Sequence, residues 1–589
     1  MNHHLSKISI KNFRSCKDID INFSSFTPLI GYNNAGKSTI LNAIEWLFKK
    51  KLLSSDDYTN PDNPIEVIGT VKGITEDILS ALTEENRTRI SPYIIDEALI
   101  FKRQQPVGAQ SAKDVRLLIK NPENNEFRTS PTGIENAIKA LFPDPIRIGA
   151  MENAADDSSK SKTGTTIGKL LAELSCKIEE KHTQMILSHL NAVNRRMTAT
   201  GNKRISDLND IDDSISSKVA DFFPGISLKL HFELPDFKDI FKSGTVKVYE
   251  DSFPGIARDC SSYGHGTQRS IQMALIRHLA DITNGDDIKT TTLLLIDEPE
   301  LYLHPFAIEQ IRESLKTLSH HGYQIIFSTH SSQMITSDLA KDTVLIRKNS
   351  QRGTHCRLTL KEAVNKVIEQ RPAQATHLFS LTQSSKVLFA NNVILTEGKT
   401  ETTLLPFIFN KVKNKTLGQM QIALIETGSV ESISKTMQIL NSMDIPTKAI
   451  VDLDFAFRGA IRNNFLEHND EDILRLKEIL RSMHANGECT LDGSGLPTRG
   501  SNTTAAEAFA IMSQKPGARE FLSSLAAKLR NANIWIWLNG SIENHLGLTE
   551  KNESVWADFK TKADTQPLSD ICADFESIEA LVDWITPDV

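Results

Sequence analysis

Long apolar runs are missing from this chain of 589 residues. The longest, such as residues 293–296 (LLLI), extend over only a few positions, whereas a membrane-spanning helix needs about 20 apolar residues. The N-terminal segment MNHHLSKISIKNFRS alternates polar and apolar residues and lacks the continuous apolar stretch of a signal peptide. We therefore expect a cytoplasmic protein that does not associate with a membrane.

Paired cysteines are also missing. The six cysteines are scattered singly and no two are spaced as CxxC, which excludes the common sequence signatures of zinc sites and redox motifs. They are Cys16, Cys176, Cys260, Cys356, Cys489 and Cys572. We expect them to be reduced, inert core thiols.

Excess charge of one sign is small, because 67 Lys and Arg stand against 74 Asp and Glu, a net charge of -7. Such a balance gives no general attraction to nucleic acid, so any phosphate contact must come from a local basic patch or from bound metal ions. Glycine and proline are scarce and 39% of the residues are hydrophobic, a composition typical of a globular protein. The length favours two to four domains.

A phosphate-binding loop is present near the N-terminus. Residues 31–38 (GYNNAGKS) fit GxxxxGK[ST] at every fixed position, between an expected strand at 28–30 and an expected helix at 38–48. In such a loop, backbone N–H groups and the helix N-terminus surround the phosphates, a lysine neutralises the β and γ oxygens, and a hydroxyl holds Mg²⁺. The predicted nucleotide ligands are Gly31, Asn34, Gly36, Lys37, Ser38 and Thr39.

Two acidic residues follow the apolar run at residues 293–296. Asp297 is placed to support Mg²⁺, and Glu298 is placed to polarise an attacking water. Residues 325–331 (IIFSTHS) form another expected strand, which ends at His330. With the phosphate-binding loop upstream, these residues predict an ATP site.

Four elements in order resemble ABC-type ATPases of the SMC, RecF and OLD kind. They are residues 8–15 (ISIKNFRS), the phosphate-binding loop, residues 293–305 (LLLIDEPELYLHP) and residues 328–331 (STHS). The resemblance implies that His330 is a switch histidine near the γ-phosphate. It also implies that residues 263–268 (YGHGTQ), with Gly266, replace the signature loop that is presented to a partner's ATP, although they depart from the LSGGQ form. A shared site of this kind needs at least a homodimer.

A second alternation of strands and helices begins near residue 393. The expected strands cover residues 393–396, 421–426 and 448–452, and the expected helices cover 400–407 and 431–443. A further apolar strand (NIWIWL) is expected near residue 533. This order predicts a parallel sheet.

Carboxylates lie at the ends of these strands. Residues i and i+2 of a strand share a face, so Asp452 and Asp454 are expected side by side, near Glu397 at the end of a neighbouring strand. Glu401 lies one helical turn beyond Glu397. These four acids would repel one another unless cations such as Mg²⁺ or Mn²⁺ lay among them. One or two such ions are sufficient for phosphodiester hydrolysis.

The EGxxE and DxD segments resemble a Toprim domain, and an ABC-type ATPase followed by Toprim resembles the OLD (overcoming lysogenisation defect) family. The resemblance is nearer to stand-alone prophage-encoded members than to the Gabija nuclease subunit. It implies an ATP-binding, metal-dependent DNA endonuclease in defence against phages. Relatives act alone, with a helicase partner, or with a retron's reverse transcriptase and its DNA product.

By that resemblance the metal ligands are Glu397, Glu401, Asp452 and Asp454, with Ser38 and Asp297 at the nucleotide. The catalytic residues would be Glu397, Asp452, Asp454 and, for ATP hydrolysis, Glu298. The late ligand is expected to be Glu543, in the segment Ser541-Ile542-Glu543. Leu538 stands where a lysine is expected, which leaves Lys399 as a substitute.

These observations predict an α/β protein with four segments. Residues 1–160 and 226–384 form the ABC-type P-loop ATPase, and residues 385–589 form a Toprim domain with a Rossmann-like parallel sheet. Residues 161–225 form a helical insertion, with Leu171, Leu174, Ile178 and Met185 at helical spacing, and the resemblance implies that it mediates dimerisation. Residues 362–385 are the expected linker.

Other nucleic-acid enzymes fit less well. A topoisomerase needs a tyrosine nucleophile near the acids, yet all seven tyrosines lie at or before Tyr323. Primases and RecR-like proteins carry cysteine clusters, and a Rad50-like protein needs a long heptad insertion. The remaining alternative is a DNA-binding ATPase clamp of the SMC or RecF kind, with a non-catalytic Toprim scaffold.

Overall fold

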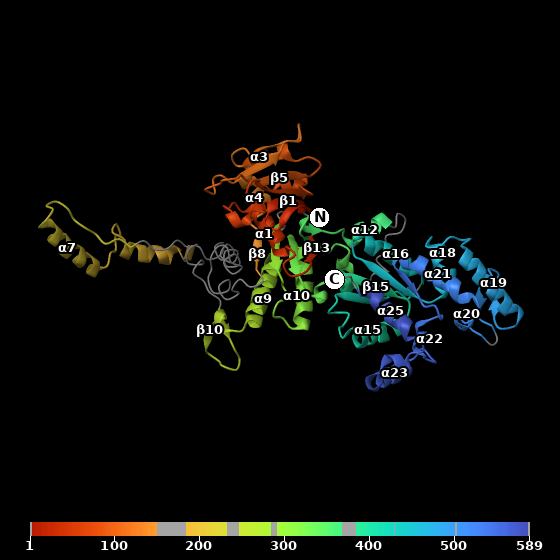
Figure 1. The fold of residues 1–589 in the computed structure, drawn as a ribbon. Coiled ribbons are helices and arrows are strands. Elements are labelled where there is room, and N and C mark those ends of the chain that lie inside the picture. Colours follow the sequence, from red (N-terminus) through yellow and green to blue (C-terminus); the bar gives the residue numbers. More distant parts are fainter. Residues whose placement is uncertain are drawn as a thin grey trace. The chain divides into compact units, whose positions relative to one another are not determined.

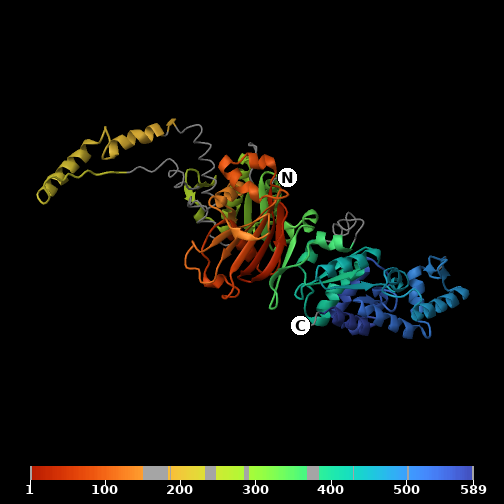
Figure 2. The same cartoon turned by 90° about the horizontal axis from the view of Figure 1, so that it is seen from above.

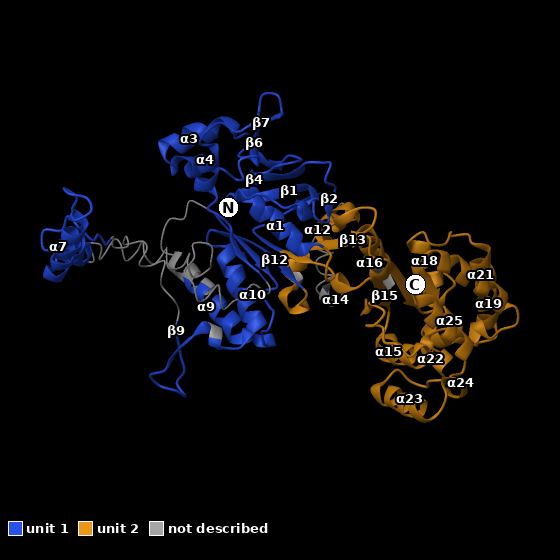
Figure 3. Ribbon diagram, turned by 60° about the vertical axis from the view of Figure 1, so that its left-hand side comes forward, with its two compact units in different colours: residues 1–27, 36–329 blue, residues 28–35, 330–589 orange. Residues whose placement is uncertain are grey.

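The computed structural model describes residues 3–149, 184–185, 187–232, 247–283, 291–367, 384–428, 430–500 and 503–586. The chain divides into two compact units, of which unit 1 comprises residues 1–27 and 36–329 and unit 2 residues 28–35 and 330–589 (Figure 3). The predicted helical positions Leu171, Leu174 and Ile178, and residues 368–383 of the predicted linker, lie outside the described residues. Among the helices described, none combines the length and apolarity needed to cross a membrane.

Unit 1, which carries helix α3 (Glu84–Ile90) and strand β5 at its top in Figure 1, contains a series of antiparallel strands in the order β7-β6-β5-β4-β1-β2, most of which are labelled in Figure 3. They are β1 (His4–Phe13), β2 (Cys16–Asn22), β4 (Ile65–Lys72), β5 (Leu99–Gln105), β6 (Arg116–Lys120) and β7 (Phe127–Thr129). Buried and less buried residues alternate along β4 and β5, as expected for strands that bury one face. Helix α1 (Lys37–Phe48) packs against β1, β4 and β5 through its apolar residues.

Three parallel strands of unit 1 carry the second half of the predicted ATP site. Strand β11 (Thr292–Asp297) pairs with both β8 (Ile146–Ile148) and β12 (Tyr323–Thr329). Its interior is buried throughout, with α1 packed against it and α10 (Pro305–Ser319) packed against β12, so the apolar run at 293–296 is a buried strand as predicted. Because β11 and β12 are parallel and in register, they end together, with Asp297 opposite Ser328.

The described part of the predicted insertion is helical. Residues 187–197 and helix α7 (Ser206–Ala220) form it, and a buried ion pair of 2.7 Å joins Arg204 to Asp212 of α7. A hairpin of β9 (Lys247–Tyr249) and β10 (Ala257–Asp259) follows, and it leads to helix α9 (His265–Thr283).

Unit 2 contains a four-stranded parallel sheet in the order β16-β15-β17-β20, as the strand and helix alternation predicts. Its strands are β15 (Asn392–Thr396), β16 (Ile422–Glu426), β17 (Thr447–Val451) and β20 (Ile534–Ile536). The helices drawn from cyan to blue surround this sheet in both ribbon views (Figure 1, Figure 2). A smaller group of strands joins β13 (Val344–Asn349) to β14 (Gly353–Cys356) and, in parallel, to Leu29 and Ile30 of β3 (Phe26–Ile30).

Successive residues of each strand in the parallel sheet belong to two different hydrophobic cores, because side chains alternate between the faces of a strand. Val393 and Leu395 join one core with α16 (Val430–Ser442), α19 (Glu471–Ala485) and α21 (Ala518–Asn531). Ile394 joins the other with α15 (Lys399–Lys413), α23 (Glu553–Thr565) and α25 (Phe575–Ile585). Ile30, the last residue before the phosphate-binding loop, belongs to the first core. With both faces covered, the sheet leaves the carboxyl ends of its strands for chemistry.

Candidate metal centre and nucleotide site

The four predicted carboxylates meet at the carboxyl ends of β15 and β17. Glu397 follows β15, Glu401 lies in the first turn of α15, and Asp452 follows β17. The DxD spacing predicted that Asp454 lies on the strand, and this prediction is wrong. Strand β17 ends at Val451, and Asp454 begins the short helix α17 (Asp454–Phe457). A turn from strand to helix, and not a shared strand face, therefore determines where the two aspartates lie.

Burial, together with repulsion between neighbouring carboxyl groups, raises the pKa values of these acids. Burial, with Asp454 and Glu401 nearby, raises the pKa of Glu397 to about 7. Burial also raises the pKa values of Glu401, Asp452 and Asp454, that of Asp452 well above its usual range. Nearby positive charge favours the ionised form of such carboxyl groups and lowers their pKa values again.

Glu543 joins the group from α22 (Ile542–Leu546), which follows β20. The Thr400 hydroxyl donates to its Oε1 at 2.6 Å. Burial favours the protonated form of Glu543, but this hydrogen bond and the charge of Lys551 outweigh burial, so the pKa is lowered. Glu543 is thus the most readily ionised of the five acids. Glu401 has a different partner, because the indole Nε1 of Trp537 donates to its Oε1 at 3.3 Å.

Lys551 supplies the positive charge that sequence reasoning failed to locate. Its Nζ lies 3.2 Å from Glu543 Oε2 and 3.6 Å from Asp452 Oδ2. Burial opposes its charged form, but these two acids raise its pKa. Leu538, the position where a lysine was expected, packs against the hydrophobic core, and Lys399 is exposed. Lys551 lies in a polar loop between α22 and α23 with no motif around it, so no spacing in the sequence could have found it.

The donor set fits divalent cations. Glu397 Oε2 and Asp454 Oδ1 are buried and lack a hydrogen-bond partner among the described residues, and carboxylate oxygens are the ligands that Mg²⁺ and Mn²⁺ prefer. In the same part of the chain no three acidic, histidine or cysteine side chains are placed to hold one ion together. Mg²⁺ commonly keeps several waters and takes only one or two carboxylates, so this spacing is compatible with hydrated ions.

The phosphate-binding loop has the conformation that its sequence requires. A Cβ at Gly31 would collide with the Ile346 carbonyl oxygen. Asn34 and Gly36 adopt positive φ angles of 63° and 105°, which glycine and asparagine tolerate best. Helix α1 begins directly after Gly36, so its free N–H groups lie at the loop. The predicted ligands in its first turn are Lys37, Ser38 and Thr39.

Asp297 lies at the end of β11 and has two partners. The Ser328 hydroxyl donates to its Oδ1, and Arg147 Nη2 lies 3.2 Å from its Oδ2 and 3.5 Å from Asn42 Oδ1 of α1. Arg147 therefore links the predicted magnesium-supporting acid to the helix that follows the phosphate-binding loop. Sequence reasoning missed it because it lies on β8, which carries no motif.

The next residue, Glu298, has a φ of 48°, and its unusual turn is braced by an arginine that sequence reasoning also missed. Arg269 Nη2 donates to the carbonyl oxygens of Asp297 and Glu298, both at 3.0 Å. Gly266 lies near the start of α9, where a Cβ would be 2.9 Å from the Tyr302 carbonyl oxygen. In unit 2, His330 is exposed and lines a cavity of about 1130 Å³.

Comparison with known proteins identifies the family. A family model described as "Overcoming lysogenization defect protein-like, TOPRIM domain" matches residues 388–454, and one described as "AAA ATPase domain" matches residues 4–146 and 124–335. The "Old nuclease" of Escherichia phage P2 is 37% identical over 99% of this chain and 100% of its own length. The chain belongs to the OLD nuclease family.

Two further relatives of this OLD protein are more distant. The "OLD nuclease" of Thermus scotoductus is 24% identical over 76% of this chain and 82% of its own length. The "Endonuclease GajA" of Bacillus cereus is 22% identical over 69% and 68%. The predicted combination of an ATPase domain with a Toprim nuclease domain is confirmed, as is the greater likeness to the phage protein than to GajA. Domains of these two kinds use nucleotide and divalent metal.

We predict that Mn²⁺ binding to the nucleotide-free protein strengthens as the pH rises from about 6 to about 8, because the ion must displace the proton of Glu397. The Glu397→Gln variant should bind more weakly and with a flatter pH profile. Calorimetric titration measures both.

A carboxyl group with a raised pKa binds more protons in the folded than in the unfolded state. The contribution of Glu397 to the melting temperature of the metal-free parent, measured as the difference from Glu397→Gln, should therefore fall as the pH rises from 4.5 towards 7. A pH-independent Mn²⁺ affinity would contradict the assignment.

A second prediction concerns Lys551. The Lys551→Met change should slow DNA cleavage about 100-fold, because the ammonium group beside Asp452 and Glu543 would no longer be there to stabilise charge on a phosphate bound at these acids. Mn²⁺ affinity should stay equal or increase, since Lys551 competes with the ion for Asp452 and Glu543. Lys399→Met is the matched control, an exposed lysine close to Glu397 in sequence, and it should cleave at the parent rate. Equal cleavage rates of the Lys551→Met and Lys399→Met variants would show that Lys551 does not contribute to cleavage.

Proposed function

We propose that this chain is an ATP-binding, divalent-metal-dependent DNA endonuclease that hydrolyses phosphodiester bonds at the carboxyl edge of its Toprim sheet. The observation that carries the proposal is the convergence there of five carboxyl groups with one lysine. Four of the acids have raised pKa values, and bound divalent ions would lower them while leaving positive charge for a phosphate substrate.

The chain's own residues have separable roles. Glu397, Asp452 and Asp454 would hold Mg²⁺ or Mn²⁺ next to the scissile phosphate, and Glu401 and Glu543 would complete the metal centre. When bound, one or two such ions activate water and stabilise the leaving oxygen. Lys551 places an ammonium group beside two of these acids, where it can stabilise the charge that develops on the phosphate. No tyrosine follows Tyr323, which favours direct hydrolysis over a covalent tyrosyl intermediate.

ATP is the proposed nucleotide. The loop ligands Gly31, Asn34, Gly36, Lys37, Ser38 and Thr39 would surround its phosphates. Ser38 and Asp297 would hold its Mg²⁺, and Glu298 would polarise the attacking water. The roles of His330 at the γ-phosphate and of Gly266 at a partner's ATP rest on resemblance to ABC-type ATPases.

A homodimer is the smallest assembly we propose, with the helical insertion as its contact. Phe222 and Phe223, which follow α7, are 80% and 63% exposed, and Ile226 is 50% exposed. Exposed aromatic residues in a group are typical of surfaces that a partner covers.

A role in defence against phages is proposed from the family. Action alone, with a helicase, or with a retron's reverse transcriptase and DNA product fits that role equally. The alternative of a DNA-binding clamp with a non-catalytic Toprim scaffold is not favoured, because a scaffold gains nothing from burying acids that repel one another.

Incubation of the full-length protein with supercoiled plasmid and Mg²⁺ or Mn²⁺ tests the proposal. The parent should nick or linearise the plasmid, and Asp452→Ala should reduce the rate at least about 100-fold. Lys37→Ala should alter the dependence on ATP and not the cutting chemistry itself, since the two sites are separate in the sequence. Nicking that survives Asp452→Ala would reject the Toprim centre, and a parent that binds Mn²⁺ without cutting would favour the clamp.

A further inference from the structure

The loop of residues 537–541 connects to two of the segments that carry the acids of the candidate metal centre. Residues 537–541 join β20 to α22, and Glu543 follows directly. The Gly540 carbonyl oxygen accepts the Leu453 N–H at 2.8 Å, and Leu453 lies between Asp452 and Asp454. The loop therefore positions the backbone that carries both aspartates as well as the helix that carries Glu543.

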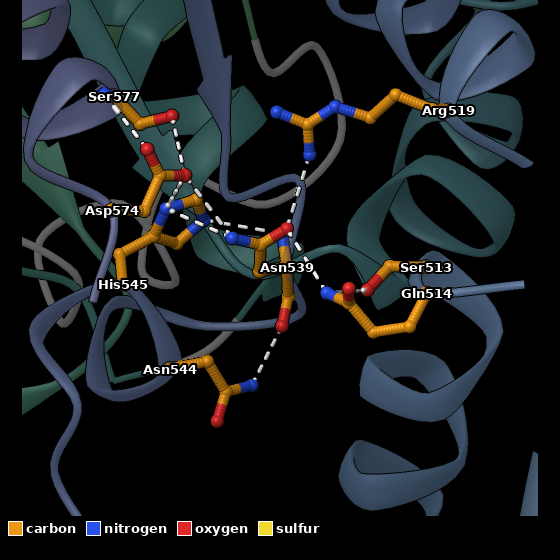
Figure 4. A network of polar contacts seen from close by, with 8 residues as sticks. All are labelled: Ser513, Gln514, Arg519, Asn539, Asn544, His545, Asp574 and Ser577. Atoms are coloured by element: carbon orange, nitrogen blue, oxygen red, sulfur yellow. Dashed lines mark hydrogen bonds and ion pairs between the residues drawn. The ribbon is translucent and has the colours of Figure 1, made fainter.

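Asn539 fixes this loop through hydrogen bonds of both its backbone and its side chain (Figure 4). Its backbone N–H donates to His545 Nε2 at 3.1 Å, and its side-chain amide donates to Asp574 Oδ2 at 3.1 Å. Its Oδ1 accepts from Arg519 Nη1 at 3.1 Å, and its backbone oxygen accepts from the Asn544 amide at 2.6 Å. The neighbouring Gly540 has a φ of 105°, and a Cβ there would lie 2.9 Å from Asn544 Nδ2. The loop has little freedom to adopt another shape.

His545 and Asp574 hold Asn539 from the opposite side. Because His545 Nε2 accepts the Asn539 N–H, its proton must be on Nδ1, which lies 2.8 Å from Asp574 Oδ2. Asp574 also accepts from the Ser577 N–H and hydroxyl at 3.2 and 2.8 Å. The His545 ring is fully buried, 5.0 Å from the Trp537 ring centroid, and the Trp537 indole donates to Glu401.

We propose that Asn539, His545 and Asp574 are positioning residues of the metal centre. This proposal rests on the proposed function. The three side chains hold residues 537–541 so that Gly540 fixes the turn between Asp452 and Asp454 while α22 presents Glu543. We do not assign them a catalytic role, because they act by holding the loop. The ring of His545 in particular has both nitrogens bound to Asn539 and Asp574. Sites of this kind need their ligands held to within about 0.5 Å, and partners one step removed from the ligands commonly supply that precision.

Asp574→Asn is the most discriminating variant. It keeps the size and shape of the side chain, but one of its two oxygens becomes an NH₂ group that must face a donor, from Ser577 on one side or from Asn539 and His545 on the other. We expect the nucleotide-free full chain to bind Mn²⁺ about 10- to 100-fold more weakly. We also expect raised Mn²⁺ concentrations to restore most of the cleavage rate.

Asp470→Ala is the control for general destabilisation. Asp470 caps α19 and pairs with Lys528 at 2.6 Å, contacts that do not involve the loop. Mn²⁺ affinity, followed by electron paramagnetic resonance, should equal that of the parent in this variant even where the melting temperature falls. Binding that remains in Asp452→Asn is subtracted to isolate the Toprim centre.

Arg519→Ala keeps the test open if Asp574→Asn fails to fold, because Arg519 is exposed and donates directly to Asn539. Weaker Mn²⁺ binding in either variant, with the control unchanged, supports the proposal. Parent-like Mn²⁺ affinity in every folded variant overturns it and leaves the network a purely structural role. A parent that binds Mn²⁺ but cuts no DNA overturns the proposed function alone, since the binding measurement does not depend on cleavage.

Discussion

Carboxyl groups buried close together repel one another, and at the edge of the Toprim sheet this repulsion organises the surrounding structure. A parallel sheet covered by helices on both faces brings the ends of β15 and β17 to one edge, and the acids that follow them are withdrawn from water. Lys551 offsets part of the cost for Asp452 and Glu543, the Thr400 hydroxyl does so for Glu543, and the Trp537 indole does so for Glu401. The unpartnered oxygens of Glu397 and Asp454 show where that compensation is incomplete. Divalent cations would supply the missing positive charge, and carboxylate oxygens are ligands that they prefer.

Motifs with fixed spacing predicted most of this arrangement. The alternation of expected strands and helices predicted the parallel sheet, and the acids at the ends of its strands predicted that Glu397, Glu401 and Asp452 are neighbours. Asp454 lies beside them for a different reason, because the chain turns into α17 and not along a strand. Spacing rules assume that the local structure continues, and at the end of a strand it does not.

Residues that act through tertiary contacts could not be predicted in this way. Lys551 lies in a loop, and Arg147 is on a short strand whose sequence carries no motif. Asn539 and Asp574 are 35 positions apart and meet because α25, whose N-terminus Asp574 caps, packs against α22. The core also joins distant segments, since Ile30, directly before the phosphate-binding loop, shares a hydrophobic core with Val393 and Leu395 of the Toprim sheet. Sequence motifs locate the reactive groups, whereas packing determines what holds them.

Anomalous X-ray diffraction from crystals of the full chain grown with Mn²⁺ tests the central claim most directly. The account predicts anomalous density among Glu397, Asp452 and Asp454, with Glu401 and Glu543 on its border, and none there in crystals of Asp452→Asn. Mn²⁺ confined to other parts of the protein, with these carboxyl groups turned away from one another, would contradict it.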